Sequence, residues 1–341
     1  EDVLTMTTPE QDVIDQAALY VRIYFIGMPA SMFYNFGSAV LRAVGDTKRP
    51  LYYLSAAGVL NVLLNLLFVI RFSMGVAGVA LATSISQYLS AALIAICLMR
   101  SESCYRLHWD ELALHKDKAL PIIRIGLPAG LQSSIFAISN VVIQSSINSF
   151  GSIAMAGSAA AANIEGFVYV SMNSVAQASL SFASQNIGAR RYERISKISR
   201  TCLLLAALFG LVLGNGVYLL HDTFLRFYSP DPAVIEAGAL RLSVICTTYF
   251  LCGLMDTLAC ILRAMGKSLL PMVVTIIGAC GLRVLWIYTV FPLDRTFFTL
   301  FLSYPITWGV TAAVHAVCYF FTKRTMLRRA QASAPSEASS T

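Results

Sequence analysis

Long apolar runs separated by short polar breaks fill this chain. A helix that crosses a membrane needs roughly 20 mainly apolar residues, and more when it is tilted. The runs predict nine membrane-spanning helices, at 17–44, 50–72, 75–99, 120–149, 152–187, 196–220, 233–265, 270–291 and 296–322. Strands of membrane barrels are close to ten residues long and alternate in polarity, so they fit these runs poorly. The pattern predicts an all-α membrane protein, a polytopic helical bundle.

One charged loop divides the predicted helices. Residues 100–119, "RSESCYRLHWDELALHKDKA", are the only long charged stretch between apolar runs. We expect them to form a cytoplasmic loop between the remainder of an N-terminal lobe at 1–99, with three helices, and a C-terminal lobe at 120–325, with six. The small polar residues 326–341 predict a disordered tail.

The composition excludes several classes of protein. The chain is 57% hydrophobic and 13% charged, whereas a soluble domain carries about 25% charged residues. The cysteines lie mostly in apolar runs without a CxxC motif, which argues against a metal site or a disulfide framework. The four histidines lie in loops or alone, and no phosphate-binding motif occurs. We expect neither an enzyme nor a cofactor.

The distribution of Lys and Arg predicts how the chain is oriented in the membrane. Lys and Arg concentrate in the loops after the first, third, fifth, seventh and ninth helices, which places these loops and the C-terminus in the cytoplasm of a multi-pass cell (inner) membrane protein. Residue 1 then lies outside the cell. The basic stretch 188–200 is expected on anionic lipid heads rather than on nucleic acid. The opposite side carries Arg22, Arg71, Arg226, Arg241 and Arg295.

One phrase occurs twice in the sequence. "LRAVGDTKRP" at 41–50 returns as "LRAMGKSLLP" at 262–271, and the same offset aligns "ISQYLSAALIAIC" at 85–97 with "ITWGVTAAVHAVC" at 306–318. The first three helices therefore correspond to the last three. A six-helix repeat implies three further helices before residue 1, twelve in all, in two pseudo-symmetric lobes. Parallel repeats of this kind are typical of secondary transporters that hold substrate between their halves.

Polar side chains inside the apolar runs are the candidates for function, because they are costly in a membrane. Three are ionisable: Asp256, Glu165 and Arg283. Amides and hydroxyls form a face with Glu165 on 152–187 and a second polar face on 120–149, and such faces either line a cavity or bond to neighbouring helices. The face of 152–187 comprises Ser158, Glu165, Tyr169, Asn173, Gln177, Ser181 and Ser184, and that of 120–149 comprises Ser133, Asn140 and Gln144.

Asp256 breaks the symmetry of the repeat. It lies seven residues before Arg263, whereas its repeat mate Asn35 lies seven before Arg42. A carboxylate in a low-dielectric cavity readily takes up a proton and equally attracts an organic cation. A structural contact between Asp256 and Arg263 is the alternative. Arg283 also needs a partner, and we hypothesise a pair with Glu165, since both belong to the second lobe.

Five stretches in order resemble the multidrug and toxic compound extrusion (MATE) transporters: "TPEQDVIDQAALYVRIYFIG" (8–27), "LRAVGDTKRPLYY" (41–53), "GVAGVALATSISQ" (75–87), "GLPAGLQSS" (126–134) and "SQNIGARR" (184–191). The resemblance covers the chain to about residue 325. It implies twelve helices in two six-helix lobes, of which this chain lacks the first three. It also implies an antiporter that exports drugs or organic cations in exchange for Na⁺ or H⁺. We expect it to work by alternating access and as a monomer. The alternative is a lipid or polysaccharide flippase of the same superfamily.

The resemblance also points to Asn61 and Asn65, which lie on one face of 50–72. Many family members have Asn and Asp at this pair, in a cation site completed by an Asp on the family's first helix. Asn65 replaces that Asp, which weakens the case for Na⁺ at this pair, although amide oxygens still ligate hard cations. Glu165 and Asp256 then remain as the acidic residues for coupling in the second lobe.

Overall fold

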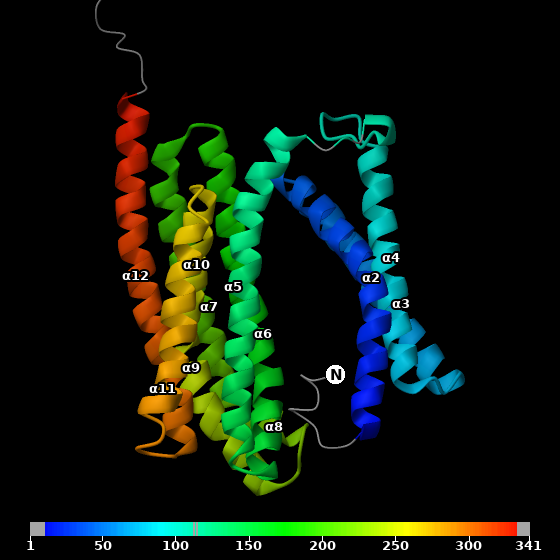
Figure 1. Ribbon diagram of the computed structural model, residues 1–341, viewed down its shortest axis with the longest axis vertical. Coiled ribbons are helices and arrows are strands. Elements are labelled where there is room, and N and C mark those ends of the chain that lie inside the picture. The colour runs from blue at the N-terminus through cyan, green and yellow to red at the C-terminus, as the bar shows by residue number, and fades with distance from the viewer. Residues whose placement is uncertain (1–10, 112, 114, 333–341) are drawn as a thin grey trace, which may run out of the picture. The chain divides into compact units, whose positions relative to one another are not determined.

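The structure is a computed structural model that describes residues 11–111, 113 and 115–332 (Figure 1). Helices make up its regular structure, and the described residues contain no strand. The long helices are α2 (Gln11–Ala43), α3 (Lys48–Leu66) with the π-helical turn η1 (Leu67–Arg71), α4 (Gly75–Met99), α5 (Lys116–Asn148), α6 (Ser152–Gly188), α7 (Ile195–Leu219), α9 (Pro232–Ala264), α10 (Leu269–Thr275) continued by the π-helical turn η4 (Ile276–Gly281) and α11 (Leu282–Thr289), and α12 (Phe297–Ala332). The short pieces are η2 (Trp109–Glu111), η3 (Tyr192–Arg194) and α8 (His221–Arg226).

The all-α membrane class is confirmed, with one change in the number of spans. Eight helical stretches of the described chain are long and apolar enough to cross a membrane. The ninth, α2, has 33 residues but does not qualify, because Arg22, Asn35 and several tyrosines make it more polar. At the other end α12 continues to Ala332, into the segment expected as a tail, and residues 333–341 lie outside the described residues.

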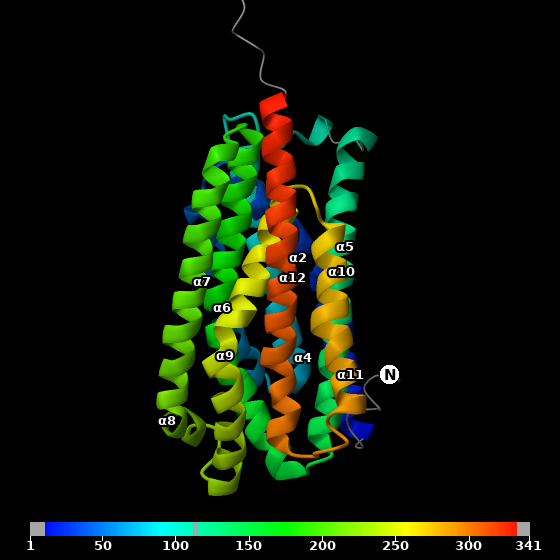
Figure 2. The same cartoon turned by 90° about the vertical axis from the view of Figure 1, so that its left-hand side faces the viewer.

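The chain forms two compact units, Glu1–Leu114 and His115–Thr341. In the carboxy-terminal unit α9 is the central helix and packs along α6, α7 and α12 (Figure 2). Its buried residues run from Val234 to Leu262, so it has no broad lipid-facing side. The core around it includes Met172 of α6, Ile245 of α9 and Phe301 of α12.

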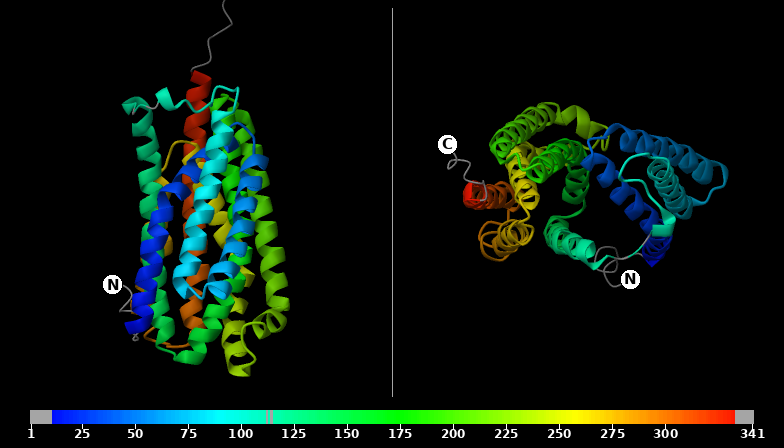
Figure 3. Two further views of the ribbon diagram at one scale, coloured as in Figure 1. Left: turned by 90° about the vertical axis from the view of Figure 1, so that its right-hand side faces the viewer. Right: turned by 90° about the horizontal axis from the view of Figure 1, so that it is seen from above.

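In the amino-terminal unit α2 lies along α4, and α3 packs mainly on α4 (Figure 3). The same pattern returns in the other unit, where α9 packs along α12 and the α10–α11 segment also contacts α12. The helix bounds follow the same offset as the repeated phrase. When Gln11–Ala43 of α2 is moved along the sequence by that offset, it coincides with Pro232–Ala264 of α9. The predicted correspondence of the first three helices with the last three is confirmed.

The repeated phrase builds the same helix end twice. Gly45 and Gly266 both have positive φ, 90° and 76°. The N–H of each glycine donates to the Arg carbonyl three residues before it, at 3.0 and 2.9 Å, and the next N–H donates to the Leu carbonyl five residues before it, at 2.9 and 3.0 Å. This Schellman motif closes a helix on a left-handed residue, which glycine adopts without strain. The phrase therefore has a structural role.

Glycines of α7 allow its backbone to approach α9 closely. Gly210 and Gly214 form a GxxxG pair, a spacing that brings membrane helices together. A Cβ added at Gly210 would meet the backbone of Phe250, and one at Gly214 would meet the carbonyl oxygen of Cys246. The absence of side chains at these two positions sets the distance between α7 and α9.

We predict that Gly214→Ala lowers the free energy of unfolding by about 1–3 kcal/mol, the usual cost of overpacking. The matched control is Gly216→Ala on the same helix, where an added Cβ meets no atom within 4 Å. Thermal unfolding of the purified variants in detergent measures both. Equal unfolding midpoints for the two variants would contradict the proposed backbone contact.

Candidate functional site

A cavity of about 330 Å³ lies within the carboxy-terminal unit, among α5, α6, α9 and α10. All four elements belong to stretches able to cross a membrane. Its walls combine aromatic, amide and charged side chains. The lining residues are Gln132, Ser133, Phe136, Tyr169, Asn173, Gln177, Cys252, Met255, Asp256, Ala259, Cys260, Arg263 and Thr275.

Three of the predicted site residues meet in this cavity: Asp256, Asn173 and Gln177. Tyr169, Asn173 and Gln177 follow one another at intervals of four residues, so they form one stripe along α6. Asn173 and Gln177 hydrogen-bond to no other side chain among the described residues, which favours a cavity wall over interhelical bonding. The stripe faces the carboxylate of α9 across the cavity.

Asp256 forms no ion pair in the described part of the chain, although Arg263 also lines its cavity. It is half-buried, and neither a hydrogen bond nor an ion pair reaches its carboxylate. Arg263 lines the same cavity but its Nη2 donates to Oε1 of Gln132, at 2.7 Å. The alternative of a direct contact between Asp256 and Arg263 is therefore not observed. The carboxylate is available to a ligand.

Glu165 is paired, but with Arg241. Arg241 Nε and Nη2 donate to Oε1 and Oε2 of Glu165, at 2.8 and 2.9 Å, and its Nη1 donates to Ser158 Oγ at 2.6 Å. The exposed fractions of Glu165 and Arg241 are 5% and 8%. The hypothesis of a Glu165–Arg283 pair is wrong, because the nearer guanidinium lies directly across the interface of α6 and α9.

Arg241 is the partner of Glu165 that the sequence analysis missed, since it was assigned to the outer side of the membrane. It lies nine residues after Pro232, the first residue of α9, and therefore about 14 Å into the helix. A signal for this start exists in the sequence: Asp231 followed by Pro is a strong helix N-terminus, and Asp231 Oδ1 accepts from Ala233 N–H at 2.9 Å.

Arg283 and Asn140 lie together, away from Glu165. Arg283 is fully buried, and its Nη1 donates to Asn140 Oδ1 at 3.4 Å. Its guanidinium carbon lies 4.2 Å from the ring centre of Tyr304 and 5.5 Å from that of Phe136. This cation is held by aromatic faces in place of a carboxylate.

The predicted residues of the amino-terminal unit fall into two places. Asn65 Nδ2 donates to Asn61 Oδ1 at 3.0 Å, and Asn61 Nδ2 lies 3.5 Å from Thr83 Oγ1. Asn35 is exposed and its Nδ2 donates to the Ser31 carbonyl, at 2.9 Å, within its own helix. Asn61 and Asn65 thus form one amide pair, and Asn35 is not part of it.

Comparison with known proteins identifies the family. The MatE family model matches residues 1–67 and 128–289. The chain belongs to the MatE family. Its family is one of transporters, as the resemblance to MATE proteins predicted.

Curated relatives of this MatE chain carry names of drug-resistance proteins. The probable multidrug resistance proteins YpnP and YoeA of Bacillus subtilis are 31% and 27% identical, over 82% and 83% of this chain. The FAD transporter of Shewanella oneidensis is 25% identical over 78% of this chain. The chain spans 62%, 63% and 59% of these relatives, respectively.

Solved MATE structures share the fold of this chain. The crystal structure of MATE in complex with MaL6 superposes with a TM-score of 0.87, at 19% identity, over 96% of this chain and 74% of that one. The Vibrio cholerae MATE transporter VcmN in the bent form gives a TM-score of 0.78, at 18% identity, over 90% and 69%.

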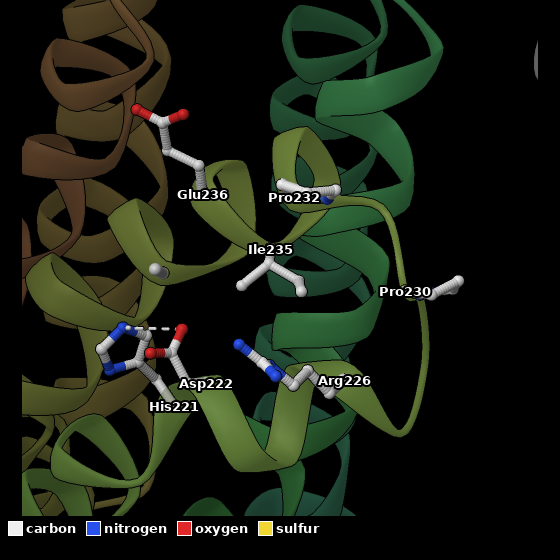
Figure 4. Close-up of a pocket in the computed structure, with 8 residues that line it drawn as sticks. His221, Asp222, Arg226, Pro230, Pro232, Ile235 and Glu236 are labelled. Carbon is white, nitrogen blue, oxygen red and sulfur yellow. Dashed lines mark ion pairs between the residues drawn. The ribbon is translucent and has the colours of Figure 1, made fainter.

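A second cavity of this MatE chain, of about 700 Å³, lies between α8 and the start of α9. Figure 4 shows His221 and Asp222 turned toward each other, with Glu236 pointing away from both. His221 Nε2 lies 3.6 Å from Asp222 Oδ1. No residue of the predicted site lines it, and no group of three metal-ligating side chains occurs among the described residues.

We predict that Glu165→Ala destabilises the MatE chain by about 3–5 kcal/mol, because it leaves the Arg241 charge buried without a partner. Adding Arg241→Met removes that charge and should recover most of the loss. Thermal unfolding in detergent measures the double-mutant cycle. The control cycle combines Glu165→Ala with Arg283→Met, for which we expect additive losses; strong coupling in the control cycle alone would refute the observed pairing.

Proposed function

We propose that this chain belongs to a secondary antiporter that exports drugs or organic cations in exchange for H⁺ or Na⁺, by alternating access. The observation that carries the proposal is the free carboxylate of Asp256 in a cavity between membrane-spanning helices. In a low-dielectric site a carboxylate that forms no ion pair attracts a cation or a proton. Substrate and coupling ion then compete for the same group.

The walls of the cavity suit a cation with an apolar body. Phe136 and Tyr169 supply aromatic faces, which attract organic cations, and Met255 adds an adaptable apolar surface. The volume of about 330 Å³ falls within the range of small-molecule sites. Oxygens of Asn173 and Gln177 beside the carboxylate are ligands that a hard cation such as Na⁺ accepts.

Glu165 has a different part in this proposal. Both of its oxygens are engaged by Arg241, so we assign it to holding α6 against α9 and leave ion binding to Asp256. Asn61 and Asn65 form a second, uncharged candidate for a cation in the amino-terminal unit, where Oδ1 of Asn65 is buried and accepts no hydrogen bond from the described residues.

The names of the relatives and the predicted topology support a transporter in the cell membrane. Relatives named for multidrug resistance or export occur in Bacillus subtilis, Thermotoga maritima and Staphylococcus aureus. We further propose that the chain resides in the cell (inner) membrane with its C-terminus in the cytoplasm, acts as a monomer and contacts lipid along its exposed apolar helix faces. Small organic cations are its proposed partners.

An anionic substrate is the second candidate function, in line with the flippase alternative. Arg263 supports it, because its guanidinium lines the cavity and its Nε has no hydrogen-bond partner. The relative named FAD transporter points the same way, since FAD carries phosphates. The free carboxylate of Asp256 in the same cavity opposes it and favours the cation.

We predict that Asp256→Asn weakens binding of ethidium, a fluorescent organic cation, by about tenfold, which corresponds to about 1.4 kcal/mol. Fluorescence anisotropy with the purified chain measures it. Binding to the unsubstituted protein should weaken as the pH falls, because protonation removes the negative charge of Asp256. Binding to Asp256→Asn should be weak at every pH.

The control is Asp222→Asn, which removes a carboxylate from the second cavity and should bind ethidium as the unsubstituted protein does. Titration with Na⁺ at constant ionic strength identifies the coupling ion: displacement of ethidium indicates Na⁺, and displacement by protons alone indicates H⁺. Equal ethidium affinity for Asp256→Asn and the unsubstituted protein contradicts the assignment of Asp256.

A further inference from the structure

Arg283 is a buried positive charge that forms no ion pair with any described residue. Its side chain is fully buried, and a guanidinium stays protonated in proteins. Asn140 Oδ1 accepts from Nη1 at the long distance of 3.4 Å. Nε and Nη2 have no hydrogen-bond partner among the described residues. Two charged donors therefore point at nothing that accepts a hydrogen bond.

The acids of the unit do not neutralise it. Both oxygens of Glu165 are taken by Arg241. No carboxylate, including that of Asp256, lies within the 4.0 Å of an ion pair with Arg283 in the described part of the chain. A buried ion is tolerated in a membrane when it forms an ion pair or when its hydrogen-bonding groups have partners. The guanidinium of Arg283 meets neither condition among the described residues, which favours a bound ligand.

The surroundings of Arg283 offer donors and ring faces. Tyr304 and Phe136 contact the guanidinium. Trp308 packs on Tyr304, with ring centres 5.4 Å apart, and its Nε1 is also buried without a partner. Arg and Trp side chains are donors only. Buried donors that lack an acceptor among the described residues, with no carboxylate within ion-pair distance of Arg283, are suited to an anion.

A π-helical turn and a residue of the cavity wall both lie next to Arg283. The π-helical turn η4 ends two residues before Arg283, and π turns are frequent at functional sites. Phe136 both lines the cavity that holds Asp256 and contacts Arg283.

We propose that Nε and Nη2 of Arg283 bind a small monovalent anionic group, of the size of a halide ion or a carboxylate, between the rings of Tyr304 and Phe136. The group comes from free inorganic anion or from the carboxylate of a bound substrate. The proposal goes beyond the cation site of Asp256 and does not depend on it.

The test is thermal unfolding of the purified full chain in detergent, at fixed Na⁺ and fixed ionic strength, while chloride replaces gluconate. The unfolding midpoint of the unsubstituted protein should rise with chloride and reach a plateau. Arg283→Gln should lose this dependence. Arg226→Gln removes an exposed arginine outside the spans and should keep it. No chloride dependence, or the same dependence in Arg283→Gln, overturns the proposal.

Replacing chloride with formate separates the two sources. Saturable stabilisation by both anions indicates a site that also accepts a substrate carboxylate, and stabilisation by chloride alone indicates a free inorganic anion. Because Arg283→Gln has a folding risk, iodide quenching provides a second measurement. In Trp109→Phe, which retains Trp286 and Trp308, iodide should quench fluorescence with a saturable component that chloride displaces. Purely linear quenching overturns the proposal.

Discussion

A bidentate ion pair between Glu165 and Arg241 joins α6 to α9 inside the carboxy-terminal unit. Next to it, Gly157 of α6 faces Gly238 of α9 at a distance too small for an added Cβ. These contacts fix the register of two helices that run in the same direction. The same register then brings the stripe of Tyr169, Asn173 and Gln177 to the level of the carboxylate of α9, and the cavity follows from it.

The charged groups in this unit differ in what satisfies them. Glu165 and Arg241 form an ion pair, and Ser158 Oγ accepts a further hydrogen bond from the guanidinium of Arg241. Asp256 and Arg283 have no ionic partner among the described residues, although each lies within a membrane-spanning stretch. A paired charge contributes to packing, whereas an unpaired charge in a low-dielectric interior creates affinity for a ligand of opposite sign. This difference separates the structural acid of the unit from its binding acid.

The two copies of the repeat share their backbone geometry but differ in their polar side chains. Both copies end their first helix on a glycine with positive φ and pack the first helix along the third. The π turns fall at different places, at the end of α3 in one copy and between α10 and α11 in the other. An exposed amide at Asn35 corresponds to the cavity carboxylate at Asp256. Backbone geometry is thus shared, and side chains distinguish the two units.

Several features could be predicted from the sequence because they depend on neighbouring residues. Apolar length and periodicity located the helical stretches, the repeated phrase located two helix ends, and four-residue spacing placed Asn173 and Gln177 on one stripe of α6. Two details differ from the prediction: α2 is the predicted long helix but is more polar than the eight apolar stretches, and α12 continues to Ala332, past its apolar part.

The partners of the charged residues were decided by the tertiary structure alone. The hypothesis from the sequence paired Glu165 with Arg283, and nothing in the spacing of the residues pointed to Arg241 instead. The register and rotation of α6 and α9 determine the partner of Glu165, because they set which side chains come within about 3 Å of each other across the interface. Sequence therefore determined which residues enter the membrane, and the packing of α9 determined which of their charges are neutralised and which stay free to bind.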